Sequence, residues 1–188
     1  MKDIVILGSA RAGKTTLARK INKIYPNYHI INGDCIRQAF QTALPQTKIG
    51  MREWEGKKED FAKFTATFFK EEIKWNKGHY NYIFENCDIS AENAIKYFQD
   101  ESTIILFLGY SNLNKEKVFN NWKKYDTPED WTYKKTDDEL LKYAEQYVKD
   151  SKEFQTECEK YHIKYVDTSY NREKILKELL EEIINIIK

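Results

Sequence analysis

The stretch Gly8-Ser9-Ala10-Arg11-Ala12-Gly13-Lys14-Thr15 decides the fold of this chain, because it fits the pattern GxxxxGK(S/T) of a phosphate-binding loop. The two glycines let the backbone wrap phosphate oxygens with bare N–H groups, and the helix that follows points its positive end at the same anion. Lys14 adds a charge between the β- and γ-phosphates, and Thr15 offers its hydroxyl to Mg²⁺. This phosphate loop therefore predicts a site for a nucleoside triphosphate and Mg²⁺.

The segments on either side of the phosphate loop have the character that the motif requires. Residues 3–7 (DIVIL) form a short apolar run rich in β-branched side chains, which is typical of a strand buried on both faces. Residues 14–24 place Leu17 and Ile21 on one helical face, and Pro26 ends the pattern. A strand before the loop and a helix after it argue against a chance match.

Short apolar runs later in the chain predict more strands, separated by helical patterns. These strands are expected at residues 29–32, 80–85, 103–108 and 163–167. Within residues 57–77, an apolar helical face is predicted from Phe61, Phe64, Phe68 and Phe69. Thr136 and Glu139 form a capping box ahead of a long helix, and the last helix begins near Arg172. Alternating strands and helices predict an α/β fold in three layers, with helices on both faces of a parallel sheet.

The length of 188 residues and the absence of a low-complexity linker predict a single domain over residues 1–188. Two segments between strands are too long to be simple crossovers, at about residues 35–79 and 110–161. Both are expected to be inserts that cover a site.

Composition narrows the class of partner. The 31 basic and 30 acidic residues leave a net charge of +1, which excludes a charged tail protein and argues against a nucleic-acid partner. Three cysteines without a CxxC pair argue against a disulfide framework or a zinc site. The first apolar run is too short for a signal peptide, and no run approaches the roughly 20 apolar residues of a membrane helix. We therefore expect a cytoplasmic protein without a membrane partner; the sequence indicates no oligomeric state.

The motif GSARAGKT, directly after a first strand, resembles the phosphate loop of nucleotide and small-molecule kinases. This family includes adenylate, shikimate, gluconate and adenylylsulfate kinases. The resemblance implies a kinase-like P-loop NTPase fold with sheet order 2-3-1-4-5. It also implies that the insert after the second strand binds the phosphoryl acceptor and that the insert after the fourth strand forms a lid over ATP. We call the two long segments the acceptor insert (about 35–79) and the lid insert (about 110–161).

The acceptor insert begins with a second motif. Residues 32–37 (NGDCIR) resemble the DGDxxR stretch of adenylylsulfate kinase-like enzymes, with Asn32 in place of the first acidic residue. Asp34 can take or orient the proton of an acceptor hydroxyl and lie near Mg²⁺, while Arg37 can clamp an acceptor phosphate or carboxylate. Alternatively, Asp34 caps the next helix and Arg37 lies in its solvated first turn. The two interpretations are compatible.

Arginine is scarce, with 5 residues against 26 lysines, so an arginine inside an insert is a candidate for a site. Arg52 is predicted to be a second acceptor clamp, although a surface arginine is the alternative. Arg172 opens the last helix, after the strand whose following loop contacts adenine in the resembled family. It is predicted to stack on the base; a surface position in the first helical turn is again the alternative.

The acidic partner of the metal site does not follow a clean pattern. Glu85 comes directly after the apolar run of the third strand, and Asp88 lies one turn later. Glu85 is ranked first and Asp88 second as companions of Thr15 in a Mg²⁺ site, and Asp34 can share this role.

The lid insert departs from the family, whose lid carries arginines that neutralise the transferring phosphoryl group. Between Tyr110 and Tyr161 the chain has none, and offers Lys115, Lys117, Lys123, Lys124, Lys134 and Lys135. Lysine supplies charge but not the bidentate fork, and Arg11 of the phosphate loop can compensate in part.

Together these features predict an ATP-dependent, Mg²⁺-dependent phosphotransferase that moves the γ-phosphoryl group to a small acceptor. The acceptor stays open between a nucleoside, a nucleoside monophosphate and another hydroxyl-bearing metabolite. The expected nucleotide is ATP rather than GTP. The chain also lacks the NKxD and DxxG motifs, which argues against a GTPase. The predicted catalytic residues are Lys14, Asp34 and Arg37. The predicted nucleotide-binding residues are Gly8, Ser9, Ala10, Arg11, Ala12, Gly13, Lys14, Thr15, Thr16 and Arg172. The alternative is an ATPase or nucleotide sensor without kinase activity.

Overall fold

Five parallel strands form one sheet at the centre of the molecule, in the order β2-β3-β1-β4-β5. The computed structural model describes residues 1–50, 55–128 and 130–187. The strands are β1 (Asp3–Gly8), β2 (Tyr28–Asn32), β3 (Asn81–Glu85), β4 (Thr103–Gly109) and β5 (Lys164–Asp167). β1 lies between β3 and β4, with Val5 in register with Phe84 on one side and Ile105 on the other. The expected strand order is confirmed.

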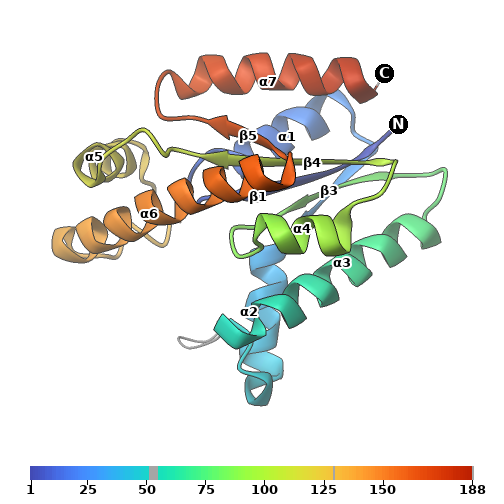
Figure 1. Cartoon of the computed structure of the whole chain (residues 1–188), viewed down its shortest axis with the longest axis horizontal. Coiled ribbons are helices and arrows are strands. Elements are labelled where there is room, and N and C mark those ends of the chain that lie inside the picture. The colour runs from blue at the N-terminus through green and yellow to red at the C-terminus, as the bar shows by residue number, and fades with distance from the viewer. Residues whose placement is uncertain (51–54, 129, 188) are drawn as a thin grey trace.

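Helices cover both faces of this sheet and make three layers (Figure 1). They are α1 (Lys14–Ile24), α2 (Gly33–Ala43), α3 (Lys58–Trp75), α4 (Ala91–Phe98), α5 (Lys115–Tyr125), α6 (Asp137–Tyr161) and α7 (Arg172–Ile187). Short 3₁₀ turns lie at Pro45–Thr47 and Glu55–Lys57. Alternate residues of β1 point to opposite cores, as the period of a strand requires. Ile4 packs with α1 and α7, whereas Val5 packs with α3 and α4.

The ends of the helices follow local chemistry that is visible in the sequence. The Ser90 hydroxyl accepts a hydrogen bond from the Asn93 N–H and caps α4. Thr136 and Glu139 form the reciprocal capping box that was expected at the start of α6. Each arrangement satisfies N–H groups that have no partner within the helix, so it fixes where the helix begins.

The predicted apolar face of α3 is wrong in part. Phe61 and Phe69 are fully buried, but Phe64 and Phe68 are 46% and 40% exposed. The buried face of α3 instead consists of Phe61 and Phe69 together with Ala62, Thr65 and Ala66. Small side chains at 62 and 66 provide a flatter contact with α4 and the sheet, while Phe64 makes an edge-on ring contact with Phe40 of α2 at 4.8 Å.

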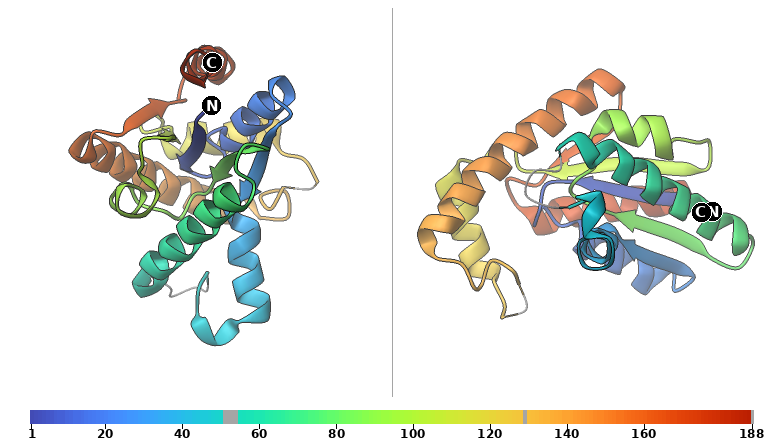
Figure 2. Two further views of the ribbon diagram at one scale, coloured as in Figure 1. Left: turned by 90° about the vertical axis from the view of Figure 1, so that its right-hand side faces the viewer. Right: turned by 90° about the horizontal axis from the view of Figure 1, so that it is seen from below.

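The lid insert extends beyond the carboxyl ends of the strands. α5 and the first part of α6 lie side by side there, joined by the segment around residue 130 (Figures 1 and 2). The buried Trp122 of α5 makes edge-on ring contacts with Trp131 and Tyr147, at centroid distances of 5.9 and 5.8 Å. Within the described residues, no helix has both the length and the apolar character needed to cross a membrane.

Candidate active site

The phosphate loop connects β1 to α1 through backbone conformations that demand specific residues. Gly8 has a φ of 109°, and a Cβ atom there would lie 2.1 Å from the carbonyl oxygen of Leu108. Gly13 has a φ of 110° directly before α1. Both glycines therefore fit positions that a side chain would strain. Arg11 has a φ of 60° despite its side chain, which is a costly conformation for a residue of this kind.

Three separate elements hold the outer side of the phosphate loop. The carbonyl oxygens of residues 10, 11 and 12 accept hydrogen bonds from Tyr110, Arg172 and Thr168, at 3.0, 3.4 and 3.1 Å. Burial raises the pKa of Tyr110 well above its ordinary value, so its hydroxyl stays a proton donor. These contacts fix the path of the loop from β4, from the loop after β5 and from α7.

Lys14 lies inside the curve of the phosphate loop. Its ammonium donates to the carbonyl oxygens of Gly8 and Ser9, at 3.0 and 2.7 Å, and the residue is only 8% exposed. Because an ammonium group is a compact charge with three donors, Lys14 can hold these carbonyls and contact a phosphate oxygen.

Thr15 and Glu85 form the oxygen-rich centre of the site. The Thr15 hydroxyl lies 2.9 and 2.8 Å from the two carboxylate oxygens of Glu85, and Asn32 Nδ2 donates to one of them at 3.0 Å. Glu85 is 3% exposed. A hydroxyl and a carboxylate are hard oxygen ligands of the kind that Mg²⁺ prefers, so these two residues fit a magnesium site beside the phosphates. Glu85 was the carboxylate ranked first for this role.

Asn32, rather than Asp34, caps α2. The Asn32 side-chain oxygen accepts hydrogen bonds from the N–H groups of Asp34 and Cys35, at 2.8 and 3.2 Å. The alternative interpretation of Asp34 as the capping residue is therefore wrong. Asp34 lies in the first turn, where the positive end of the helix favours a carboxylate. Its side chain is not used in capping and faces the cleft described below.

The Asp34 carboxylate meets Arg37 and the loop after β3. Arg37 reaches Asp34 at 3.4 Å through one nitrogen and Asp88 at 3.5 Å through the other. Burial alone would lower the pKa of Arg37, but Asp88 and Asp34 raise it above its ordinary value. Burial raises the pKa of Asp88, against the pull of Arg37. Asp88, the carboxylate ranked second for the Mg²⁺ site, is therefore paired with Arg37. Asp34, Cys87 and Asp88 bring ligand atoms within 4.8 Å of one another.

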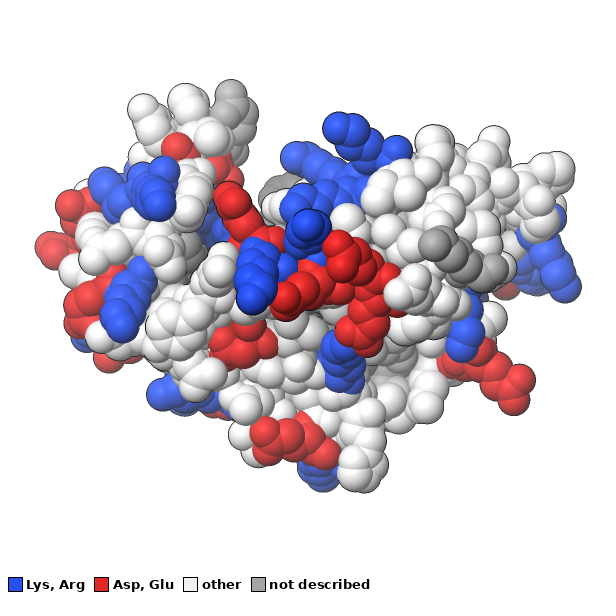
Figure 3. All heavy atoms as spheres, turned by 90° about the horizontal axis from the view of Figure 1, so that it is seen from above, with Lys and Arg blue, Asp and Glu red and all other residues white. Residues whose placement is uncertain are grey.

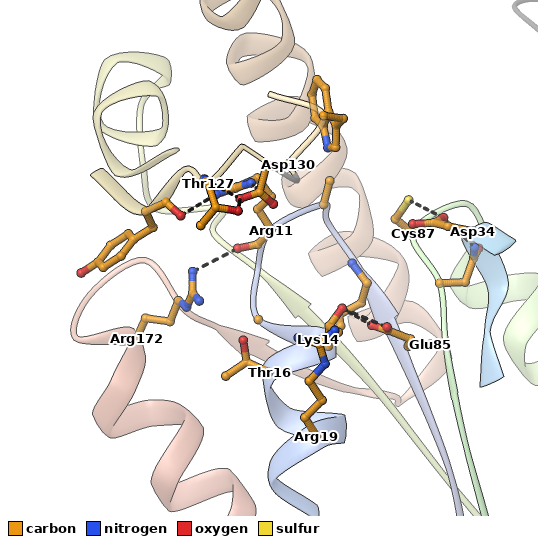
Figure 4. Close-up of a pocket in the computed structure, with 16 residues that line it drawn as sticks. Arg11, Lys14, Thr16, Arg19, Asp34, Glu85, Cys87, Thr127, Asp130 and Arg172 are labelled. Atoms are coloured by element: carbon orange, nitrogen blue, oxygen red, sulfur yellow. Dashed lines mark hydrogen bonds and ion pairs between the residues drawn. The ribbon is translucent and has the colours of Figure 1, made fainter. Parts of the chain in front are cut away.

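A cleft of about 580 Å³ joins these groups, with Lys14 between Arg172 on one side and Asp34 on the other (Figure 4). It is lined by Ala10, Arg11, Gly13, Lys14, Thr15, Thr16, Arg19, Asp34, Glu85, Asn86, Cys87, Tyr125, Thr127, Asp130, Trp131 and Arg172. Sequence reasoning missed Arg19. It lies four residues after Thr15 on α1, and this helical spacing was the available signal.

The lid insert is tied to the phosphate loop through Arg11. The Arg11 guanidinium pairs with Asp130 at 2.8 Å and Asp126 at 3.2 Å, and it donates to the Thr132 hydroxyl at 3.1 Å. The side chain of Asp126 is only 8% exposed. Arg11 thus holds the lid insert against the phosphate loop, an arrangement that the motif alone does not reveal.

Three of the six lid lysines pair with carboxylates of the lid insert. Lys123 pairs with Asp137 at 2.9 Å, Lys115 with Glu145 at 3.3 Å, and Lys135 with Glu139 at 3.2 Å. None of the six lid lysines lines the cleft; the lid contributes to its lining Tyr125, Thr127, Asp130 and Trp131. In the part of the chain that the structure describes, the lid therefore brings no cation to the site.

Two further predicted arginines differ in outcome. Arg172 lines the cleft, and its guanidinium lies 5.8 Å from the ring centre of Tyr125. Burial lowers the pKa of Arg172. Arg52 lies outside the described residues.

A parallel sheet in the order β2-β3-β1-β4-β5, with a phosphate loop after β1, defines the fold as that of the P-loop kinases. Similar solved structures bear this out. Shikimate kinase from Bacteroides thetaiotaomicron is 16% identical with a TM-score of 0.58, and the match covers 97% of this chain and 99% of that one. A gluconokinase from Sinorhizobium meliloti 1021 is 13% identical with a TM-score of 0.59, over 98% and 93%.

Deoxyadenosine kinase from M. mycoides, solved with bound dATP, is 16% identical with a TM-score of 0.50, over 97% and 99% of the two chains. No protein-family model matches the sequence, and neither does any curated protein. At these identities the likeness establishes the fold.

Proposed function

We propose that this protein is an ATP-dependent phosphotransferase that moves the γ-phosphoryl group to a hydroxyl of a small acceptor. The observation that carries the proposal is the shared cleft: Lys14 and the Thr15–Glu85 pair lie at its phosphate end, and Asp34 lies across from them. A phosphate-binding end and a carboxylate facing it are the parts that transfer to a hydroxyl requires.

Each group has a role in the proposed reaction. The phosphate loop binds the triphosphate through its N–H groups, and Lys14 neutralises charge on the oxygens. Thr15 and Glu85 hold Mg²⁺, which when bound offsets the charge of the β- and γ-phosphates. As the acceptor oxygen forms its bond to the γ-phosphorus, the bond from that phosphorus to the bridging oxygen breaks and ADP leaves. The Asp34 carboxylate receives the hydroxyl proton.

The surroundings of the cleft favour a small acceptor and ATP. On the face shown in Figure 3, basic and acidic side chains are interspersed, unlike the single-sign stripe expected for nucleic-acid binding. Arg172 and Tyr125 lie together at the nucleotide side of the cleft, where a cation and a ring can contact a purine.

A panel of phosphotransfer assays tests the proposal. ATP and GTP are each offered with nucleosides, nucleoside monophosphates and small hydroxy compounds, and acceptor phosphorylation is measured directly. We expect Lys14→Ala to abolish thermal stabilisation by nucleotide, and Asp34→Asn to keep that stabilisation while losing transfer. If Asp34→Asn transfers phosphate at the wild-type rate, the proposed role of Asp34 is wrong.

A second candidate function is a nucleotide sensor or ATPase without kinase activity. It is favoured by one observation: none of the described lid residues that line the cleft is a cation. Nucleotide binding without transfer to any acceptor in the panel would support this candidate over the kinase.

A further inference from the structure

The wall of the cleft that faces the phosphate loop has a distinctive charge. Opposite Lys14 and the Thr15–Glu85 pair, the described residues that line the cleft are Asp34, Asn86 and Cys87, which are a carboxylate, an amide and a thiol. This wall therefore presents negative charge and neutral groups to an acceptor.

Arg37 does not supply a positive charge to this wall of the cleft. It does not line the cleft; its guanidinium is shared between Asp34 and Asp88, at 3.4 and 3.5 Å. The Asp88 side chain is 15% exposed. If Arg37 turned toward an acceptor anion, it would leave this carboxylate desolvated and unpaired, which costs several-fold more than breaking an exposed pair.

The stem of Arg37 is also held in place. A Cβ atom on Gly50 would lie 2.5 Å from Arg37 Cγ, so the backbone at Gly50 packs directly on this side chain. The Gly50 carbonyl in turn accepts a hydrogen bond from Gln41 of α2. Arg37 thus acts as a strut between α2, the turn at Gly50 and the loop after β3.

The lid insert supplies an aromatic surface to the same cleft. Trp131 lines the cleft and is 41% exposed, while its ring is held by edge-on contacts with Trp122 and Tyr143 at 5.9 and 5.2 Å. A ring fixed by neighbours and open on one side can stack on a planar group.

From this geometry we infer that the acceptor carries no negative charge, and that its class is a nucleoside or a similar uncharged hydroxyl compound with a planar ring. Nucleoside monophosphates and carboxylated sugars are excluded because this wall carries the Asp34 carboxylate and, among the described residues, no cation; Asp88 sets this preference by retaining Arg37. The inference rests on the proposed function and chooses among the acceptors that the sequence left open.

Matched pairs of acceptors test the inference on the wild-type protein. Each nucleoside is compared with its 3′-monophosphate, which keeps the same 5′-hydroxyl, and a hexose is compared with its hexonate. The kcat/KM for ADP formation with each acceptor is measured. We expect the uncharged member of a pair to be used at least about 50-fold better, because like charges placed together cost several kcal/mol. The ratio should shrink as salt screens the repulsion.

The Asp88→Asn variant provides a second arm. Removing this charge releases Arg37 toward the cleft, so the preference for the uncharged acceptor should fall about tenfold or more. Equal or better use of the anionic member by the wild-type protein overturns the inference and leaves the proposed function standing. No transfer to any acceptor overturns both. The Arg52→Gln variant is an independent check. If Arg52 clamps an anionic acceptor, this variant uses the anionic member of a pair less well than the wild-type protein does, and the inference is wrong; we expect no such loss.

Discussion

The hydroxyl of Thr15 lies within 2.9 Å of both carboxylate oxygens of Glu85, although the two residues are 70 positions apart in the sequence. The pairing of β1 with β3 brings them together, because the carboxyl ends of neighbouring parallel strands meet at one edge of the sheet. This pair joins Thr15 of the phosphate-loop motif to Glu85, the metal-site carboxylate that no clean sequence pattern identifies.

Replacing Glu85 with glutamine should separate magnesium binding from nucleotide binding. Glutamine keeps the size of the side chain and an oxygen for Thr15 but removes the charge. We expect the Mg²⁺-dependent part of ATP affinity to fall about 10- to 100-fold. Thermal stabilisation by ATP, compared between samples with Mg²⁺ and samples with EDTA, measures this Mg²⁺-dependent part of the affinity. Glu182→Gln, at an exposed pair with Lys164, is the control. An unchanged Mg²⁺ response in Glu85→Gln would exclude Glu85 from the site.

Alanine at Gly8 should destabilise the whole protein. The new Cβ would meet the Leu108 carbonyl oxygen, and the φ of 109° is strained for alanine. We expect a loss of about 2 kcal/mol or more in the free energy of unfolding, measured in urea. Gly56→Ala is the matched control, because a Cβ there meets nothing within 4 Å. Similar stabilities of the two variants would contradict the close approach of β1 and β4.

Arg11 affects the free energy of unfolding in two opposing ways, and a pair of variants can separate them. Arg11→Ala and Arg11→Gly both leave Asp126 without its guanidinium, which should cost about 2 kcal/mol. Only glycine also relieves the φ of 60°. Arg11→Gly should therefore be about 1 kcal/mol more stable than Arg11→Ala in urea unfolding. If the alanine variant is the more stable one, the strain at position 11 is refuted.

The pairing of Arg11 with Asp130 should persist through ordinary acid titration. Burial raises the pKa of Asp130, but the hydrogen bonds from Thr127 and the charge of Arg11 outweigh it and hold the pKa below 3.8. The contribution of a carboxylate with a lowered pKa is complete above the ordinary value and lost as pH falls through the lowered one. The stability gap between wild type and Asp130→Asn should be constant from about pH 5 to 8 and close only below 3.8.

Urea unfolding at a series of pH values measures this gap. A gap that already closes between about pH 5 and 6 would show that Arg11 and Thr127 do not hold Asp130 in its charged form.

Arg19 and Lys123 should differ in their effect on ATP. Arg19 lines the cleft, whereas Lys123 pairs with Asp137 outside it. We expect Arg19→Ala to weaken ATP binding about threefold, as for one solvated charge near a phosphate, and Lys123→Ala to leave it unchanged. Titration calorimetry with ATP gives both values. Weaker binding in the lysine variant alone would restore the lid lysines as the cations of the site.

Local chemistry made the core of the fold predictable. The motif at residues 8–15 identified the phosphate loop, and five apolar runs identified the strands, because both signals lie in adjacent residues. The alternative that Asp34 caps α2 was wrong because Asn32, two positions earlier, is also a residue type that caps helices. The partial exposure of Phe64 was missed because small residues, together with Phe61 and Phe69, set the buried face of α3.

Longer-range pairings were not accessible from the sequence. Arg11 meets Asp126 and Asp130 more than a hundred positions away, and no local pattern records such a pair. The same holds for the retention of Arg37 by Asp88, which depends on the placement of the loop after β3. Charges could be counted from the sequence, but their partners depended on the fold.

The three bonds to the carbonyl oxygens of residues 10–12 have a consequence for binding. Tyr110, Thr168 and Arg172 belong to the folded framework, so the loop keeps its curve when no phosphate is present. The entropic cost of ordering the loop is then met during folding and is not subtracted from the affinity for nucleotide. Preorganisation of this kind favours a rapid encounter with the triphosphate that needs no rearrangement of its receptor.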